Sequence, residues 1–430
     1  MPTARGWIVA ALGLLIAICG NLFGAQTLIQ LGYALIVLVF IAIVVVRLGN
    51  QELAVKRAVS PERARLGEKV TAKIRIENYG RRRTPLLLAE DRLPEGLSGR
   101  PRFAIQGMER EGWRETAYAL TPSRRSRYEI GPLTISVVDP FGLARVAIES
   151  DATSTFLVHP RFTRLITPRD PLDRRVISTA AARNPAVTRG EEFYTLREYV
   201  EGDDLRRIHW PSTAKRGRYM IRQEETPWQT RATILLDDFG GAHDASGDYS
   251  SFEAMIEGAA SLVDMYHRIG FSYRLAASLD PGVASGRGSE QRNRCLDRLA
   301  VLTASPSSDP DPAATKLLEL DASATGPEAA LMISAGSLTP AAATALVRAA
   351  RRFRQVGLVC FPAHRYGANS TKSRWAAEAQ LKEVFRLLIN SNIRCTALGP
   401  DDDLAVGWAA MWQAKKPSME AQWVQRPEPV

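Results

Sequence analysis

Residues 7–24 are WIVAALGLLIAICGNLFG and residues 28–46 are LIQLGYALIVLVFIAIVVV, two stretches without a charged side chain. Each approaches the ~20 residues that a helix needs to cross a ~30 Å hydrocarbon layer. Only residues 25–27 separate them, so we expect two membrane-crossing helices joined as a tight hairpin. A cleaved signal peptide is the alternative for the first stretch, but a second apolar stretch follows at once, as in a stop-transfer pattern.

Basic residues flank the expected hairpin on its outer ends. Arg5 precedes the first stretch, and Arg47, Lys56 and Arg57 follow the second, whereas the connection between the stretches is uncharged. Loops rich in Lys and Arg stay on the cytoplasmic side of a membrane. We therefore predict a multi-pass protein of the inner (cytoplasmic) membrane, with both ends of the hairpin and the soluble body in the cytoplasm.

The rest of the chain is basic and has the composition of folded domains. With 430 residues, two or three domains are expected, and 45% hydrophobic residues suffice for real cores. The net charge of +10 suits nucleic acid or anionic lipid, so membrane lipid is an expected partner. The four cysteines include no C-x-x-C pair, which argues against a disulfide framework or a zinc site.

Residues 51–160 follow the two-residue period of β-strands. In residues 70–77, Val and Ile alternate with Thr, Lys, Arg and Glu, and a turn follows at Asn78-Tyr79-Gly80. Further short strands are expected at residues 85–90, 113–120, 128–130, 133–138 and 156–158. We therefore predict an all-β, sandwich-like domain. The run Arg81-Arg82-Arg83 falls on a hairpin tip, where it is either a solvated loop or a contact with lipid phosphates.

A charge-dense connector occupies residues 161–230. Its core, residues 190–210, is GEEFYTLREYVEGDDLRRIHW. Gly202 suits a turn, and Asp203 suits the N-cap of a short helix that we expect to stop near Pro211. A strand over residues 218–223 is expected to lead into the next domain.

This motif, from Leu196-Arg197-Glu198-Tyr199 through residues 202–210 (GDDLRRIHW) to Ala214, resembles that of the bacterial domain of unknown function 58 family. Residues 139–143 (DPFGL) resemble a second hallmark of that family, as does a double membrane span before a β domain. Pro211 and Lys215 depart from the family pattern, which usually has lysine and arginine at these places.

The clustered charges of the motif admit several interpretations. One is a network of Arg–carboxylate ion pairs that fixes the connector to the neighbouring domain. Another is a docking surface of the Arg/Trp type. Its candidate residues are Arg197, Tyr199, Gly202, Asp203, Arg206 and Trp210. A His209-centred catalytic arrangement with Asp203 or Asp204 and Ser212 is disfavoured, because catalytic partners usually converge from distant segments. The acidic residues of the connector disfavour nucleic acid, because they repel phosphate.

Residues 231–415 alternate apolar strands with amphipathic helices. Strands are expected at residues 233–236, 271–277, 330–334, 358–362 and 394–398, and helices at residues 252–268, 292–303, 340–356 and 375–391. Such alternation predicts an α/β domain, a doubly wound parallel sheet with helices on both faces. Residues 284–290 and 305–311 are expected to be surface loops. Residues 401–403 are expected to cap the last helix, and Cys360 and Cys395 to lie in the core. A tail follows at residues 416–430.

This half resembles the von Willebrand factor A domain, which often carries a metal site that begins D-x-S-x-S after the first strand. Here Phe239 and Gly241 replace the two serines that would follow Asp237, and starting from Asp238 gives Gly240 and Ala242. We therefore expect no metal and no cofactor. The alternative is a divergent site built from Asp237, Asp238 and Asp244.

The function expected from these resemblances is a membrane-anchored, non-enzymatic scaffold or adaptor. Its partners would be a MoxR-type AAA+ ATPase and other A-domain membrane proteins, with assembly or chaperone activity at the membrane. Asp237 and Asp238 join the candidate contact residues, because ligands of open α/β sheets collect at the carboxyl edge. No catalytic residues are predicted, since P-loop, G-x-G-x-x-G and G-x-S-x-G motifs are missing from the sequence. The alternative is a metal-dependent adhesion module or an enzyme acting on cell-envelope material.

Overall fold

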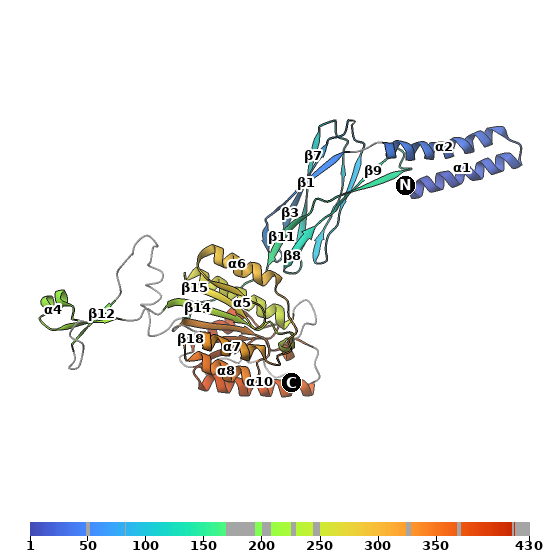
Figure 1. The fold of residues 1–430 in the computed structure, drawn as a ribbon. Helices are drawn as coiled ribbons and strands as arrows, with labels where there is room; N and C mark the ends of the chain where they lie inside the picture. Colours follow the sequence, from blue (N-terminus) through green and yellow to red (C-terminus); the bar gives the residue numbers. More distant parts are fainter. Residues whose placement is uncertain are drawn as a thin grey trace. The chain divides into compact units, whose positions relative to one another are not determined.

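The computed structural model describes residues 1–48, 52–81, 83–168, 194–199, 208–224, 229–243, 250–323, 328–367, 371–414 and 417. It forms two compact units, which meet in the sequence at Pro160 and Arg161 (Figure 1). Gly202, Asp203, Asp204, Arg206 and Asp244, like the tail apart from Pro417, lie outside the described residues.

Two apolar helices open unit 1, α1 (Ala4–Leu22) and α2 (Gln26–Leu48). Both are long and apolar enough to cross a membrane, by length and composition. Glycines let the two backbones approach closely, because a Cβ at Gly32 would lie 2.5 Å from the Gly13 carbonyl oxygen. The prediction of two apolar helices is confirmed.

The strand-rich part of unit 1 contains three sheets, ordered β1-β3-β7-β5, β10-β9-β4-β6 and β2-β11-β8. Their strands are β1 (Leu53–Ser60), β2 (Arg63–Arg65), β3 (Val70–Asn78), β4 (Leu87–Asp91), β5 (Leu97–Gly99), β6 (Arg102–Ile105), β7 (Trp113–Pro122), β8 (Ser126–Ile130), β9 (Leu133–Val138), β10 (Arg145–Ser150) and β11 (Ser154–His159). Neighbouring strands are antiparallel, except that β2 and β11 are parallel.

One apolar core joins the three sheets to the end of α2. The alternation predicted for residues 70–77 is confirmed, because Val70, Ala72, Ile74 and Ile76 are fully buried while the residues between them are less buried. Val39, Ala42 and Val46 of α2 belong to the same cluster. The sequence analysis did not predict β1, β2, β5, β6 and β10, whose side chains are mostly exposed or half-buried.

A buried ion pair crosses this core. Nη2 of Arg57 donates to Oδ1 of Asp91 over 2.8 Å, and both side chains are almost fully buried. The Tyr118 hydroxyl donates a short hydrogen bond to Oδ2 of the same carboxylate. Burial and this bond raise the pKa of Tyr118 above its usual range, so the hydroxyl remains a donor. The three residues belong to β1, β4 and β7 and tie two sheets together.

Unit 2 is built on a six-stranded sheet ordered β16-β15-β14-β17-β18-β19. Its strands are β14 (Gln229–Leu236), β15 (Ser272–Ala277), β16 (Val283–Gly286), β17 (Glu328–Ala335), β18 (Phe353–Cys360) and β19 (Arg394–Ala397). All neighbours are parallel except β15 and β16. The predicted parallel sheet is confirmed.

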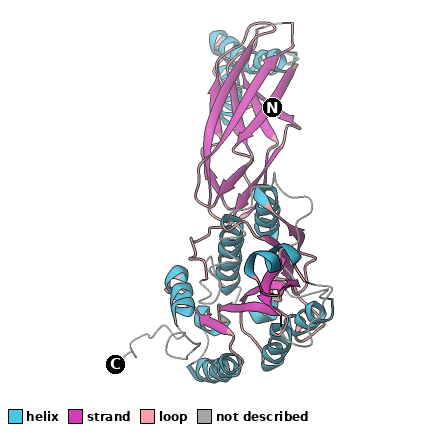
Figure 2. Cartoon of the chain, turned by 90° about the vertical axis from the view of Figure 1, so that its left-hand side faces the viewer, coloured by secondary structure: helices cyan, strands magenta, loops and turns pink. Residues whose placement is uncertain are grey.

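Helices cover both faces of this sheet (Figure 2). One core lies under α5 (Ser251–Arg268), α6 (Gly288–Val301) and α11 (Leu404–Gln413), and the other under α7 (Pro312–Ser323), α8 (Pro340–Ala350) and α10 (Thr371–Asn390). From Ala330 to Ile333, successive residues of β17 face opposite cores, and the whole strand is buried. Cys360 and Cys395 lie in the second core, as predicted.

Two sequence predictions for unit 2 were wrong, and one helix was missed. The expected loop at residues 284–290 forms most of β16 and the start of α6, because Gln291 holds β16 by donating to the carbonyl of Ala284. The helix expected over residues 340–356 ends at Ala350, and β18 already begins at Phe353, which is buried. Helix α7 was not predicted at all.

Removal of Asp91 will destabilise the β-rich part of unit 1. In Asp91→Ala the buried guanidinium of Arg57 loses its counter-charge, so we expect the free energy of unfolding to fall by about 3–5 kcal/mol. Hydrogen–deuterium exchange of β4 and β7 amides in the detergent-solubilised full chain measures this. The control is Glu90→Ala, which breaks an exposed pair with Arg102 and should leave exchange nearly unchanged. Equal effects of the two variants would contradict the prediction.

Candidate functional site

The candidate site lies at the carboxyl edge of the parallel sheet, where β14 ends at Leu236 and is followed by Asp237 and Asp238. The chain continues from β14 to β15 on one side, whereas β17 lies on the other side of β14. Strand order therefore reverses between β14 and β17. In open α/β sheets ligands bind outside the carboxyl ends of strands at such a switch point.

Asp237 is buried at this point, with 4% of its surface exposed. Its Oδ1 accepts from the Ser278 hydroxyl over 3.1 Å and from the Phe239 N–H over 3.4 Å. Among the described residues, Oδ2 has no hydrogen-bond partner. Burial raises the pKa of Asp237 to about 7, and the nearby carboxylates of Asp238 and Asp311 act in the same direction.

Asp238 has a different role. Its Oδ1 accepts from the Leu279 N–H over 2.8 Å and its Oδ2 from the Asp280 N–H over 3.0 Å. Burial raises the pKa of Asp238, while the hydrogen bond from the Leu279 N–H lowers it. The side chain is 1% exposed. Asp238 thus joins the end of β14 to the loop after β15 and presents no open carboxylate oxygen to a partner.

A cavity of about 180 Å³ opens beside Asp237. Asp311 and Ser337 supply polar groups to its wall, and Phe239, Pro310 and Leu338 supply apolar surface. Oδ1 of Asp311 accepts from the Ala314 N–H in the first turn of α7, and Oδ2 accepts from the hydroxyl of Thr339, the N-cap of α8. The sequence analysis missed Asp311 and Ser337, because strand order rather than sequence spacing brings them to Asp237. The sequence Asp311-Pro312 is typical of the start of a helix and could have indicated that Asp311 lies at a helix N-terminus.

The cavity is chemically suited to a small cationic group. Sites for drug-sized ligands are usually about 300–1,000 Å³, so this volume suits an ion or one side chain. In the part of the chain that the structure describes, no group of three His, Cys, Asp or Glu residues is placed to hold a metal ion. The carboxyl groups of Asp237 and Asp311 and the apolar residues of the wall together suit the charged head and the aliphatic stem of a basic side chain.

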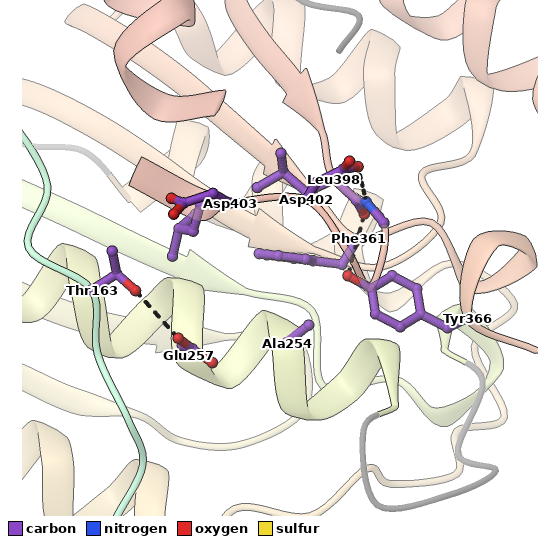
Figure 3. A pocket seen from close by; sticks show the side chains of 10 residues that line it. Thr163, Ala254, Glu257, Phe361, Tyr366, Leu398, Asp402 and Asp403 are labelled. Carbon is purple, nitrogen blue, oxygen red and sulfur yellow. Dashed lines mark hydrogen bonds between the residues drawn. The ribbon is translucent and has the colours of Figure 1, made fainter. Parts of the chain in front are cut away.

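A second cavity, also of about 180 Å³, lies near the carboxyl ends of β18 and β19 (Figure 3). Glu257 on its wall accepts from the Thr163 hydroxyl over 3.3 Å. Asp402 accepts from the Gly399 N–H, and Asp403 caps α11 by accepting from Ala405 and Val406. The predicted capping role of residues 401–403 is confirmed for Asp403. These acids stabilise loops and helix ends, so this cavity is the weaker candidate.

The connector motif forms a small hairpin with a helix. Strand β12 (Tyr194–Glu198) pairs antiparallel with β13 (Met220–Glu224), which places Arg197 opposite Ile221. Helix α4 (Trp210–Arg216) precedes β13. The helix expected to begin at Asp203 and stop near Pro211 lies mostly outside the described residues, but Ile208 and His209 are not helical, and Pro211 lies in the first turn of α4. Proline is tolerated there, since the N–H that it lacks would have no helical partner.

The hairpin brings two predicted docking residues, Tyr199 and Trp210, to one aromatic cluster. Tyr219 joins them, with edge-on ring contacts at centroid distances of 6.3 Å to Tyr199 and 6.5 Å to Trp210. Trp210 is 64% exposed and Tyr219 is 57% exposed. Glu198 and Arg218 form an exposed ion pair beside them. The sequence analysis missed Tyr219, which only the pairing of β12 with β13 places here.

His209 and Ser212 do meet, with Nδ1 of the imidazole 2.9 Å from the serine hydroxyl. The same Nδ1 accepts from the Ser212 backbone N–H, which makes His209 the N-cap of α4. The contact therefore follows from local capping geometry. The acids considered as its third partner, Asp203 and Asp204, lie outside the described residues.

Comparison with known families identifies one match. Residues 195–357 match the family described as "Protein of unknown function DUF58". The resemblance predicted from the motif is confirmed over these residues, which run from β12 to β18, and the family description assigns no function. No curated protein matches the sequence.

Solved structures resemble the chain only remotely. The CARDB domain of the PF1109 protein from Pyrococcus furiosus, in complex with di-metal ions, is 14% identical. It covers 25% of this chain and 86% of its own length, with a TM-score of 0.19. A β-glucuronidase from Bacteroides uniformis is 9% identical and covers 80% of this chain and 33% of its own length, with a TM-score of 0.18. Likenesses this weak support no argument about fold or function.

Asp237 will make unit 2 less stable as pH rises. Its pKa of about 7 in the folded state exceeds the ordinary 3.8, so the folded state keeps a proton that the unfolded state loses. Stability therefore falls between about pH 4 and pH 7, by an amount on the order of a few kcal/mol. Asp237→Asn should remove this fall and raise the melting temperature at pH 8.

The control for this prediction is Asp309→Asn. Its neighbouring N–H and hydroxyl groups lower the pKa of Asp309, so it does not titrate between pH 5 and pH 8. Thermal unfolding of the detergent-solubilised full chain between pH 5 and pH 8 gives the comparison. Asp238, whose pKa burial raises, and His243, whose pKa burial lowers, also lie near Asp237. An unaltered pH profile in Asp237→Asn would show that one of them dominates.

Proposed function

We propose that the protein is a membrane-anchored, non-enzymatic adaptor that presents its α/β unit to a protein partner. The observation that carries this proposal is the acidic cavity at the switch point of the sheet, whose wall includes the buried side chain of Asp237. The proposal has three parts, the anchor, the type of α/β domain and the partner.

The anchor is the α1–α2 hairpin in the inner membrane. Large apolar side chains cover its outer surface, for example Trp7, Leu15 and Phe40, which are 65%, 58% and 65% exposed. Soluble proteins rarely expose a patch of this size, whereas lipid tails solvate it. Arg5 and Arg47 at the outer ends favour an orientation with both ends, and hence both units, in the cytoplasm.

The α/β unit is proposed to be a von Willebrand factor A-type domain. In chain order its strands are arranged 3-2-1-4-5-6, which is a doubly wound order with its ligand edge between strands 1 and 4. Asp237 stands directly after strand 1, as the first acid of the A-type site does. Phe239 and Gly241 stand where that site has hydroxyl ligands, so the cavity keeps its acidic charge without the usual means of holding a metal.

The partner is proposed to insert one basic side chain into this cavity. Asp237 and Asp311 supply negative charge, and a basic side chain that becomes buried between them and the apolar residues of the wall is attracted more strongly than in water. The exposed cluster of Tyr199, Trp210 and Tyr219 is a second contact, because aromatic anchors dominate many interfaces. By the family resemblance, the partner is a MoxR-type AAA+ ATPase, with other A-domain membrane proteins in the same assembly.

Binding of a purified MoxR-type ATPase to the detergent-solubilised full chain tests the cavity. Loss of one member of a buried charge pair costs about 2–5 kcal/mol, so Asp237→Asn should weaken binding at least roughly tenfold. Glu319→Gln is the control, because Glu319 is exposed on α7 and, among the described residues, pairs only with Lys316. Unaltered affinity in a folded Asp237→Asn protein would remove the cavity from the interface.

The aromatic cluster has its own test in the same assay. Trp210→Ala should weaken ATPase binding strongly, whereas Trp375→Ala, which removes another tryptophan that is 74% exposed, should not. Melting temperatures of both variants separate lost contacts from lost folding. Equal binding by the two variants would place the interface elsewhere.

A metal-dependent adhesion module predicts a different response. For the adaptor, millimolar magnesium or manganese should leave the melting temperature of the full chain unaltered, in the parent and in Asp311→Asn alike. A rise with either ion that Asp311→Asn removes would favour the metal-dependent alternative, because ion binding to the folded state raises its stability.

A further inference from the structure

The pairing of the strands shows which loops lie at the same end of the strand-rich unit as the apolar helices. Strand β1 begins at Leu53, shortly after α2 ends at Leu48, and Leu53 pairs with Asn78 at the end of β3. Glu77 in turn pairs with Trp113, the first residue of β7. The loop residues 79–81, 83–86 and 106–112 therefore lie at the end of the unit from which the apolar helices emerge.

The turn at residues 139–144 lies at this end too, because main-chain bonds tie it to the start of α1. Arg145 and Met1 exchange hydrogen bonds through their main chains, and Thr3 donates from its N–H to the Leu143 carbonyl over 2.9 Å. The Thr3 hydroxyl donates to the Gly142 carbonyl over 2.6 Å. Asp139 shapes the turn by accepting from the N–H groups of Phe141 and Ala144.

The large apolar side chains that the strand-rich unit exposes gather at this end. In residues 52–81 and 83–160 they are Tyr79, Leu86, Leu88, Trp113 and Phe141. Phe141, at the tip of the Asp139 turn, is 67% exposed, and Tyr79 is 58% exposed although its hydroxyl donates to Glu77. All five lie in, or within two residues of, the three loops at this end of the unit. The opposite tip, the turn after Pro122, exposes no such side chain in the described residues.

Arginines surround these aromatic side chains. Arg81 and Arg114 are exposed and form no ion pair among the described residues. Arg83 is 68% exposed and pairs only with Glu109, itself 74% exposed, an interaction that water largely screens. The guanidinium of Arg75 stacks 4.3 Å from the ring of Trp113. Aromatic rings mixed with arginine beside apolar helices are the composition of proteins at the headgroup layer of a membrane.

We propose that this end of the strand-rich unit binds the headgroup layer of an anionic phospholipid bilayer, with Tyr79, Trp113 and Phe141 inserted and Arg81, Arg83 and Arg114 at lipid phosphates. The proposal rests on the membrane anchor proposed above and adds a lipid-binding surface outside the helices. It gives the Asp139–Leu143 motif a role, since the turn fixes Phe141 beside the helix start. With this lipid contact, the strand-rich unit lies against the membrane surface, and the helices are not its sole attachment to the membrane.

Lipid quenching of a site-specific fluorophore tests this contact in the full chain. A Cys19→Ala parent, whose other cysteines are buried, receives Phe141→Cys and is labelled with bimane. The protein is reconstituted in vesicles of phosphatidylcholine and phosphatidylglycerol that contain lipid with a nitroxide near the headgroup. We expect at least twofold quenching at position 141. The control is Ser123→Cys beyond the end of β7, about 30 Å along that strand from Trp113, where little quenching is expected.

A third labelled position separates this proposal from the membrane anchor itself. Phe40→Cys, in the middle of α2, should be quenched by lipid with a nitroxide deep in the acyl chain. Quenching at position 40 with equal, weak quenching at positions 141 and 123 would overturn the lipid-binding surface and leave the anchor intact. Failure of quenching at position 40 would overturn the anchor, and with it the surface proposal.

The arginines are tested by lipid charge. Quenching at position 141 should be stronger in vesicles with phosphatidylglycerol than in vesicles of phosphatidylcholine alone, because arginines near an anionic surface are attracted to it. The combined substitution Arg81→Ser, Arg83→Ser and Arg114→Ser should abolish this difference and leave position 40 unaltered. Equal quenching in both kinds of vesicle without the substitutions would overturn the assignment of these arginines to lipid phosphates.

Discussion

Main-chain hydrogen bonds between the first three residues and the turn at residues 142–145 attach the apolar hairpin to the folded domain beside it. The start of α1 packs closely against this turn, because a Cβ at Gly6 would lie only 2.1 Å from the Leu143 carbonyl oxygen. The other end of the hairpin enters the same core through Val39, Ala42 and Val46. Both ends of the hairpin are thus held by one domain, so any membrane that accepts the helices also meets the loops around them.

Buried carboxylates have different consequences in the two units. In unit 1 the carboxylate of Asp91 pairs with the guanidinium of Arg57 and the hydroxyl of Tyr118, so it stabilises the contact between two sheets. In unit 2 no described cation matches Asp237, and burial keeps its pKa near neutrality. A folded protein retains an unmatched carboxylate more readily where a ligand supplies the missing charge. The contrast is the physical reason for placing the partner at the sheet edge.

The fold was predictable where a periodic pattern coincided with burial on one side. Alternation in β3 and the apolar faces of α5 and α10 identified those elements directly. Strand β16 was missed because its Gly and Ser residues carry no such pattern and its pairing with β15 decides its conformation. Helix α8 was extended too far because an apolar pattern alone does not separate the end of a helix from the buried strand after it. Part of the candidate site was predictable from the sequence, since Asp237 directly follows a predicted strand. Asp311, Ser337 and Tyr219 were not predictable, because only the tertiary structure brings them to their partners.

The distribution of charge argues that the two proposed contacts are independent. The surface around the helices combines arginine with aromatic rings, which suits phosphates and headgroups, whereas the cavity beside Asp237 is acidic and small. An anionic lipid is repelled by the cavity, and a basic partner side chain is repelled by the arginines. The two proposed sites carry opposite charges, so one selects an anionic lipid and the other a basic side chain. Charge here contributes to specificity more than to affinity. One chain can then hold a membrane and a protein partner at once, without competition between them.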